Sequence, residues 1–129
     1  IKAKKKAEVE AVLVADLTRE LPLKLAGGAQ GLQREVQGGF VSDLMSCALA
    51  QAGEGTVWVT MQSHVNLLAV ASLAGMAAVI VAGGAKPEAA ALAKADEVGM
   101  PLLVTDLPAF DIVCRLHALG VGQEICDLI

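Results

Sequence analysis

Short apolar runs alternate with helix-like segments along most of the chain, and this alternation limits the possible folds more than any other feature. Strand–helix–strand units joined by short loops form parallel sheets with helical crossovers. The sequence therefore predicts an α/β fold, a three-layer domain with a mostly parallel sheet built from βαβ units. The predicted strands cover residues 23–26, 35–41, 57–61, 77–81 and 102–104. The predicted helices cover about residues 8–21, 43–52, 66–74, 87–98 and 108–119.

Residues that start and stop helices support these boundaries. Pro22 ends the first predicted helix, and Gly53 ends the second, for which Ser42 is a suitable N-cap. Pro87 in the first turn and Gly99 just past the last turn are the asymmetry expected of the fourth helix.

One apolar stretch, residues 65–82, is long enough to suggest a membrane-spanning helix. Asn66 and Ser72 interrupt it, Gly75 lies near its middle, and residues 77–81 have the β-branched character of a strand. A helix followed by a fully buried parallel strand explains the same hydropathy. We therefore expect no membrane segment.

Composition restricts the classes of function. The 129 residues suit one domain, 1–129, with an N-terminal helix region at 1–21 and a C-terminal tail at 121–129. Apolar residues make up 55% and charged residues 19%, which excludes intrinsic disorder. Aromatic residues make up only 2% and the net charge is −4, so a nucleic-acid partner is not expected.

The cysteines and the first residues bear on location and on metals. Cys47, Cys114 and Cys126 show no CxxC spacing, and with His64 and His117 they form no zinc signature. We expect plain thiols in a reducing compartment, with neither metal nor cofactor. The lysine-rich start lacks a signal-peptide pattern, so we expect a cytoplasmic protein.

Polar residues and glycines gather where the predicted parallel strands end. Ligands of α/β sheets bind outside the carboxyl ends of the strands, so these junctions form a candidate ligand-binding rim. Capping residues gather at the same junctions, with Thr105 or Asp106 capping the last helix, so a purely structural role is the alternative. The candidate ligand-binding residues are Ser42, Asp43, Gln62, Ser63, His64, Asn66, Gly83, Gly84, Lys86, Thr105 and Asp106.

The loop 62–66 is the most polar of these junctions, and it opens a helix whose backbone N–H groups could meet an anion. His64 has one of two roles. It contacts a ligand or acts in acid–base chemistry, or it is a loop histidine without a function beside a helix cap at Asn66. Recognised catalytic motifs are missing, because the sequence contains no GxxxxGK[ST], no GxGxxG and no GxSxG. Gly83 and Gly84 are equally well explained by turn geometry.

Three segments resemble the DRTGG domain family, which is itself similar to the N-terminal domain of HPr kinase/phosphorylase. The name motif is degenerate, because Glu35, Val36 and Gln37 stand in place of Asp, Arg and Thr, while Gly38 and Gly39 match. The resemblance covers roughly residues 10 to 120 and is greatest to stand-alone members. The segments are VQGGFVSDLMS at 36–46, VWVTMQSHVNLLAVASL at 57–73 and GMPLLVTDLPAFD at 99–111.

The resemblance implies a three-layer α/β fold and a non-catalytic module that regulates or assembles other proteins. In HPr kinase/phosphorylase the phosphate-binding loop lies in a separate domain, and this chain contains no such loop. We therefore expect a regulatory or interaction domain that forms a homodimer and senses a nucleotide or small anionic metabolite at the rim. An unidentified protein partner is also compatible with the resemblance.

Two alternatives remain at this stage. The first is a small enzyme that uses His64 with Asp43, Gln62 or Asp106 across the rim. The second is a fragment of a larger metabolic regulator, with its function supplied by neighbouring domains.

Overall fold

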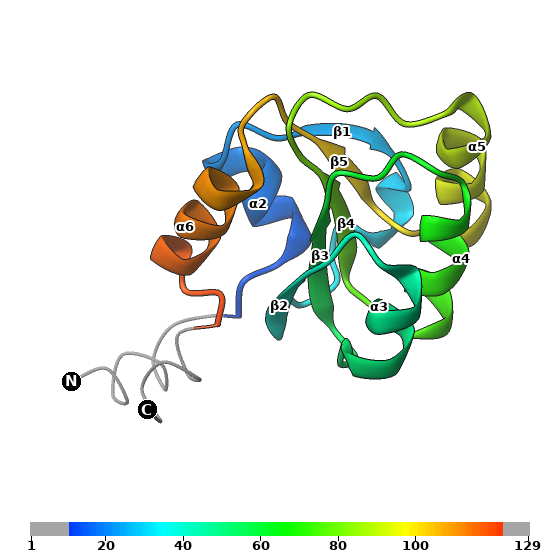
Figure 1. The fold of residues 1–129 in the computed structure, drawn as a ribbon. Helices are drawn as coiled ribbons and strands as arrows, with labels where there is room; N and C mark the ends of the chain where they lie inside the picture. The colour runs from blue at the N-terminus through cyan, green and yellow to red at the C-terminus, as the bar shows by residue number, and fades with distance from the viewer. Residues whose placement is uncertain (1–10, 123–129) are drawn as a thin grey trace.

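The computed structural model describes residues 11–122 and contains one mixed sheet flanked by helices (Figure 1). The predicted tail therefore lies outside the described residues beyond position 122, as does the predicted helix before position 11. The elements are, in order, α2 (Val14–Glu20), β1 (Lys24–Gly27), a 3-10 turn (Ala29–Gly31), β2 (Gly38–Val41), α3 (Met45–Gln51), β3 (Thr56–Thr60), α4 (Asn66–Leu73), β4 (Ala78–Val81), α5 (Ala89–Val98), β5 (Leu102–Val104) and α6 (Ala109–Leu119).

The sheet has five strands in the order β1-β5-β4-β3-β2. Strands β2 to β5 are mutually parallel, and each pairs with its neighbour in the chain. Strand β1 is antiparallel to β5, with Lys24 opposite Val104. The predicted mostly parallel sheet is thus confirmed, and the single antiparallel strand is an addition that the sequence pattern does not reveal.

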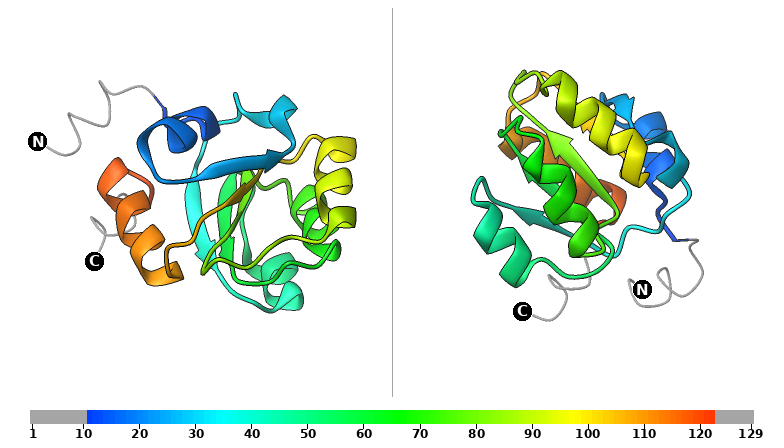
Figure 2. Two further views of the ribbon diagram at one scale, coloured as in Figure 1. Left: turned by 90° about the horizontal axis from the view of Figure 1, so that it is seen from above. Right: turned by 90° about the vertical axis from the view of Figure 1, so that its right-hand side faces the viewer.

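Helices cover both faces of the sheet. Helices α3, α4 and α5 lie on one face, and α2 and α6 lie on the other (Figure 2). All three crossovers between parallel strands pass over the same face, so the sheet is extended by one strand at each crossover. This arrangement confirms the predicted three-layer α/β architecture.

The core explains why the central strands read as continuous apolar runs. Every residue of β3 and β4 is buried, because both faces of these strands are covered by helices. Trp58, Val79 and Val81 pack toward α3, α4 and α5. Val57 and Ile80 pack toward α2 and α6. Alternate residues of the same strand therefore serve two separate hydrophobic clusters.

The first described helix begins later than its apolar spacing suggests. Asp16 accepts a hydrogen bond from the backbone N–H of Leu13 at 2.8 Å, which fixes the start of α2 at Val14. Asp16 also pairs with Arg19. The Leu13 N–H, and then Arg19, lower the pKa of the Asp16 carboxyl from its ordinary value.

Two predicted helix caps are wrong. Helix α3 starts at Met45 rather than at Asp43, and no side chain caps it. Ser42 instead closes a small turn, in which its hydroxyl accepts the Leu44 N–H at 3.0 Å. Helix α6 likewise begins after Pro108 without a side-chain cap, and Thr105 accepts the Leu107 N–H at 3.1 Å. These Ser and Thr side chains stabilise loops rather than helix ends.

The apolar stretch 65–82 forms α4, a turn at Gly75 and the buried strand β4, as predicted. In the part of the chain that the structure describes, no helix combines the length and apolar character needed to cross a membrane.

Candidate functional site

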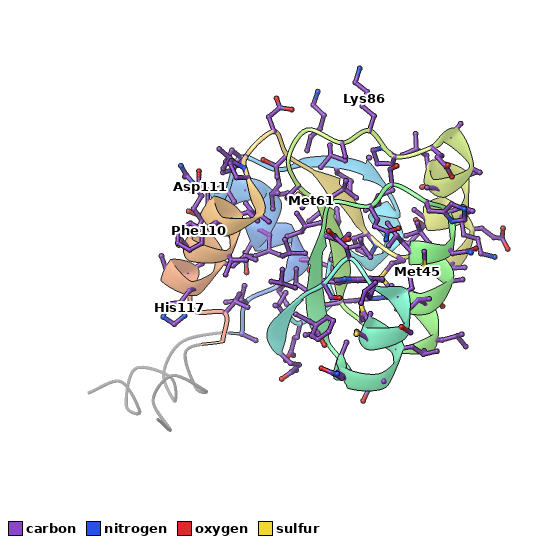
Figure 3. All side chains as sticks on the ribbon, in the orientation of Figure 1. Met45, Met61, Lys86, Phe110, Asp111 and His117 are labelled. Carbon is purple, nitrogen blue, oxygen red and sulfur yellow. The ribbon has the colours of Figure 1, made fainter. Side chains whose placement is uncertain are left out.

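The carboxyl ends of the four parallel strands lie at one edge of the sheet, which we call the rim. Met61, just after β3, and Lys86, after β4, mark this edge at the top of the molecule (Figure 3). The predicted ligand-binding residues belong to the four loops that follow these strands, except Asn66, which is the first residue of α4. Their hydrogen bonds divide them into a structural group and an exposed group.

Asp43 ties the loop after β2 to the end of β3. Its Oδ1 accepts hydrogen bonds from the Thr60 hydroxyl and from the Met61 backbone N–H, both at 2.8 Å. Gln62 donates its side-chain amide to the backbone carbonyl of Asp43, and its N–H to the Thr60 hydroxyl at 3.2 Å. Asp43 and Gln62 are therefore engaged in holding the rim together.

Ser42 belongs to the same structural group. Its carbonyl accepts the indole N–H of the buried Trp58 at 2.8 Å, and its own N–H donates to the Val59 carbonyl. A buried indole N–H needs such a partner, and the turn at Ser42 supplies it. Ser42 thus contributes its backbone rather than a free hydroxyl.

The start of α4 is already partnered within the protein. His64 accepts the Asn66 N–H at Nδ1, at 3.1 Å. The Glu88 carboxylate accepts the Val65 N–H at 3.3 Å, while the Glu88 N–H donates to the carbonyl of Ser63 at 3.1 Å. The Glu88 carboxylate therefore already accepts a hydrogen bond from a backbone N–H at the start of α4, where we expected an external anion to bind.

The loops after β4 and β5 are joined through their backbones. Gly83 donates its N–H to the Leu107 carbonyl at 2.8 Å, and Gly84 donates to the Thr105 carbonyl at 3.0 Å. The Asp106 carboxylate lies beside Gly84, within 3.5 Å of where a Cβ would stand. The structure thus brings these four predicted residues together, although their N–H groups do not face a ligand.

Acidic, basic and neutral polar side chains are all accessible at the rim. Asp43, Glu88 and Asp106 are exposed as well as His64, Asn66 and Lys86, and the ion pairs within residues 11–122 do not include Lys86. Lys24 joins them, because its pairing with Val104 places the start of β1 at the carboxyl end of β5. Sequence reasoning missed Lys24 since the antiparallel direction of β1 leaves no signal in the pattern.

Within residues 11–122, no ion pair joins His64 to a carboxylate, and the Asp43 Oδ1 accepts hydrogen bonds from Thr60 and Met61. The small-enzyme alternative therefore stays a prediction. In the same range, no group of three or more His, Cys, Asp or Glu side chains is placed to hold a metal ion.

Comparisons with known proteins add no identification. No protein-family model matches the chain, and a search of curated proteins finds no match. The resemblance to the DRTGG family thus depends on the three segments quoted above, and it stays a prediction.

Proposed function

We propose that this chain is a non-catalytic regulatory or interaction domain that forms a homodimer through β2. The observation that carries the proposal is the outer edge of that strand. Strand β2 ends the sheet, and within the described residues its outer edge pairs with no other strand. Residues 38–41 contain no charge and no proline, which are the usual protections of an exposed strand edge.

Exposed apolar side chains gather at the end of this edge. Val41 and Leu44, here called the β2 corner, are each more than half exposed, at 54% and 62%. Val41 ends β2, and Leu44 follows it just before α3. Such grouping of large apolar side chains favours contact with another protein surface.

The opposite edge of the sheet looks different. Strand β1 follows an exposed proline, Pro22, and begins with an exposed lysine, Lys24. Proline and lysine both discourage the addition of a further strand. The contrast between the two edges supports association through β2.

A second copy of the chain is the occupant that best fits this edge. A two-fold axis beside β2 pairs it antiparallel with its counterpart and places the two β2 corners on either side of the axis. Both polar backbone groups and apolar side chains would then be covered in one interface.

The oligomeric state tests this proposal directly. We expect light scattering and sedimentation to show a dimer at tens of micromolar, and Val41→Lys to weaken the dimer at least about tenfold because it buries a charge. The matched control is Leu73→Lys on α4, which replaces another exposed apolar side chain that lies far from β2 in the sequence. A monomeric native chain, or equal weakening by both variants, would overturn the proposal.

We further propose that the rim senses a small anionic metabolite or nucleotide. The supporting observation is that His64 and Lys86 are exposed in loops joined by the Glu88 hydrogen bonds, and that Lys24 is exposed at the start of β1. A ligand at 100 times its Kd stabilises the protein by about 2.7 kcal/mol, which raises the Tm by several degrees.

A thermal-shift screen against adenine nucleotides, sugar phosphates and simple anions tests the rim. We expect a selective shift that is lost in Lys86→Ala and reduced in His64→Ala. Arg115→Ala on α6 is the control, because it also removes an exposed cation but lies outside the rim loops. A flat response across the panel would leave association as the sole proposed function.

We also propose that the chain is a divergent, cytoplasmic member of the DRTGG family. The order of strands, loops and helices in residues 36–111 supports membership of the family, because the VSDL and QSHVN segments fall at two adjacent loops of the rim. The absence of CxxC spacing among the cysteines supports the cytoplasmic location.

A further inference from the structure

A groove of about 620 Å³ lies at the end of the sheet opposite the rim, where β3 and β4 begin. Its walls come from the segments 34–37, 54–55 and 72–77, together with Met100. Small-molecule sites typically enclose about 300–1,000 Å³, so the groove has a suitable size. It shares no residue with the rim or the β2 corner, so a ligand bound there is independent of the proposed function.

Arg34 is held in place on one wall of this groove. Its Nη1 donates to the Met76 carbonyl at 3.1 Å and lies 3.5 Å from the Met100 sulfur. Among residues 11–122 these contacts use only Nη1, whereas a guanidinium has five N–H donors. A half-buried, positioned guanidinium with free donors is suited to bind a carboxylate through two parallel hydrogen bonds.

Glu54 supplies a negative charge on another part of the lining. Its side chain lies over Gly75, where a Cβ would come within 3.1 Å of the Glu54 Cγ and 3.6 Å of Oε2. Glu54 is exposed and takes part in no hydrogen bond within the described residues. The ion pairs of residues 11–122 join Arg34 neither to Glu54 nor to Glu35, although all three line the groove.

Met76, Ala77 and Met100 close the groove toward the hydrophobic core. Each is only 1% exposed, so these residues offer a ligand almost no surface of their own. The groove thus combines a positive group with separate negative groups over a buried apolar layer.

We propose that this groove binds a small zwitterion, namely an α-amino acid or dipeptide. The carboxylate of the ligand pairs with Arg34, and its ammonium group pairs with Glu54. Such a ligand satisfies both charges at once, which a simple anion or a simple cation does not.

Titration of the isotope-labelled full chain with L-leucine and with leucyl-leucine tests the proposal by NMR. We expect saturable shifts at concentrations up to about 10 mM in the amide signals of Gly55 and Gly75, which line the groove. N-acetyl-leucine lacks the ammonium group and leucinamide lacks the carboxylate, so each should bind at least about tenfold more weakly than leucine.

Two variants distinguish the two charges. Glu54→Gln should weaken leucine at least about tenfold while leaving N-acetyl-leucine unchanged, and Arg34→Gln should weaken leucine while leaving leucinamide unchanged. Glu97→Gln, an exposed acid of α5 that does not line the groove, is the control and should change neither. Because Glu54 is exposed, its variant remains informative even if Arg34→Gln unfolds the protein.

Three results would overturn the proposal. The first is the absence of saturable shifts with leucine and leucyl-leucine. The second is binding that Glu54→Gln leaves unchanged. The third is a set of shifts confined to the rim loops at 62–66 and 83–86, which would place the zwitterion at the opposite end of the sheet.

Discussion

Asp43 is predicted to stabilise the fold, and replacing it with alanine measures by how much. The substitution removes the acceptor of two hydrogen bonds, from the Thr60 hydroxyl and the Met61 N–H. Met61 is exposed, so its N–H finds water and little free energy is lost. Thr60 is only 1% exposed, and its hydroxyl is left without that acceptor at a cost of about 1–3 kcal/mol.

We therefore expect Asp43→Ala to lower the free energy of unfolding by about 2 kcal/mol, equivalent to a Tm lower by roughly 8 °C for a domain of this size. Urea unfolding measures the change, with Trp58 fluorescence as the signal. Trp58 is the single tryptophan, is fully buried and donates to the carbonyl of Ser42, so it reports on this corner of the fold.

Asp43→Asn is the matched control, because its amide oxygen still accepts from both donors. We expect it to cost less than about 1 kcal/mol. A double-mutant cycle with Thr60→Val should recover part of the loss, since the valine leaves no hydroxyl to satisfy. The reasoning fails if Asp43→Ala and Asp43→Asn are equally destabilising, or if the cycle shows no coupling.

Two further predictions concern stability. Leu13 and Arg19 lower the pKa of Asp16 in the folded state, so the stability from this group is complete well above its ordinary pKa of 3.8 and lost as the pH falls below it. The stability difference between native protein and Asp16→Asn, measured by urea unfolding from pH 7 to pH 2.5, should therefore shrink toward low pH; a difference independent of pH would contradict this. Gly28→Ala should destabilise by about 3 kcal/mol or more, because φ is +75° and the new Cβ would lie 1.9 Å from the Met100 carbonyl oxygen. Gly38→Ala, with nothing within 4 Å, should stay within about 0.5 kcal/mol, and similar Tm values for the two variants would refute the steric argument.

The parallel part of the fold could be predicted because its local signals and its burial agree. Helix α4 and strand β5 have the predicted bounds or nearly so, since apolar residues fill helical positions in one and a buried strand in the other. The start of α3 could not be predicted, because Ser42 has the chemistry of a capping residue but bonds to Leu44, while Asp43 bonds to Thr60 at the end of β3 and to Met61 just after it. Thr60 and Met61 are distant from Asp43 in the sequence, whereas capping propensity reflects only hydrogen bonds between residues that are close in the sequence.

The positions of the rim residues in the fold could be predicted, whereas their hydrogen-bond partners could not. The sequence placed the rim residues at the strand ends, but it could not reveal that Glu88 would occupy the N–H of Val65. Nor did it indicate Lys24, which reaches the rim only because β1 runs antiparallel. The groove beside Arg34 was missed entirely, since its walls are separate segments that only the tertiary fold brings together.

The order of strands in the sheet also has a consequence for how the chain acquires its structure. Strands β3 to β5 each pair with the strand before them, so each can add to a sheet already begun by β2 as the chain leaves the ribosome. Strand β1 emerges earlier than all of them, yet its partner β5 emerges last. Closing that long loop is slow because it costs entropy before any contact compensates it. During synthesis, β1 can therefore pair only after β5 has been made. The apolar residues of β1 lack their strand partner for most of that time.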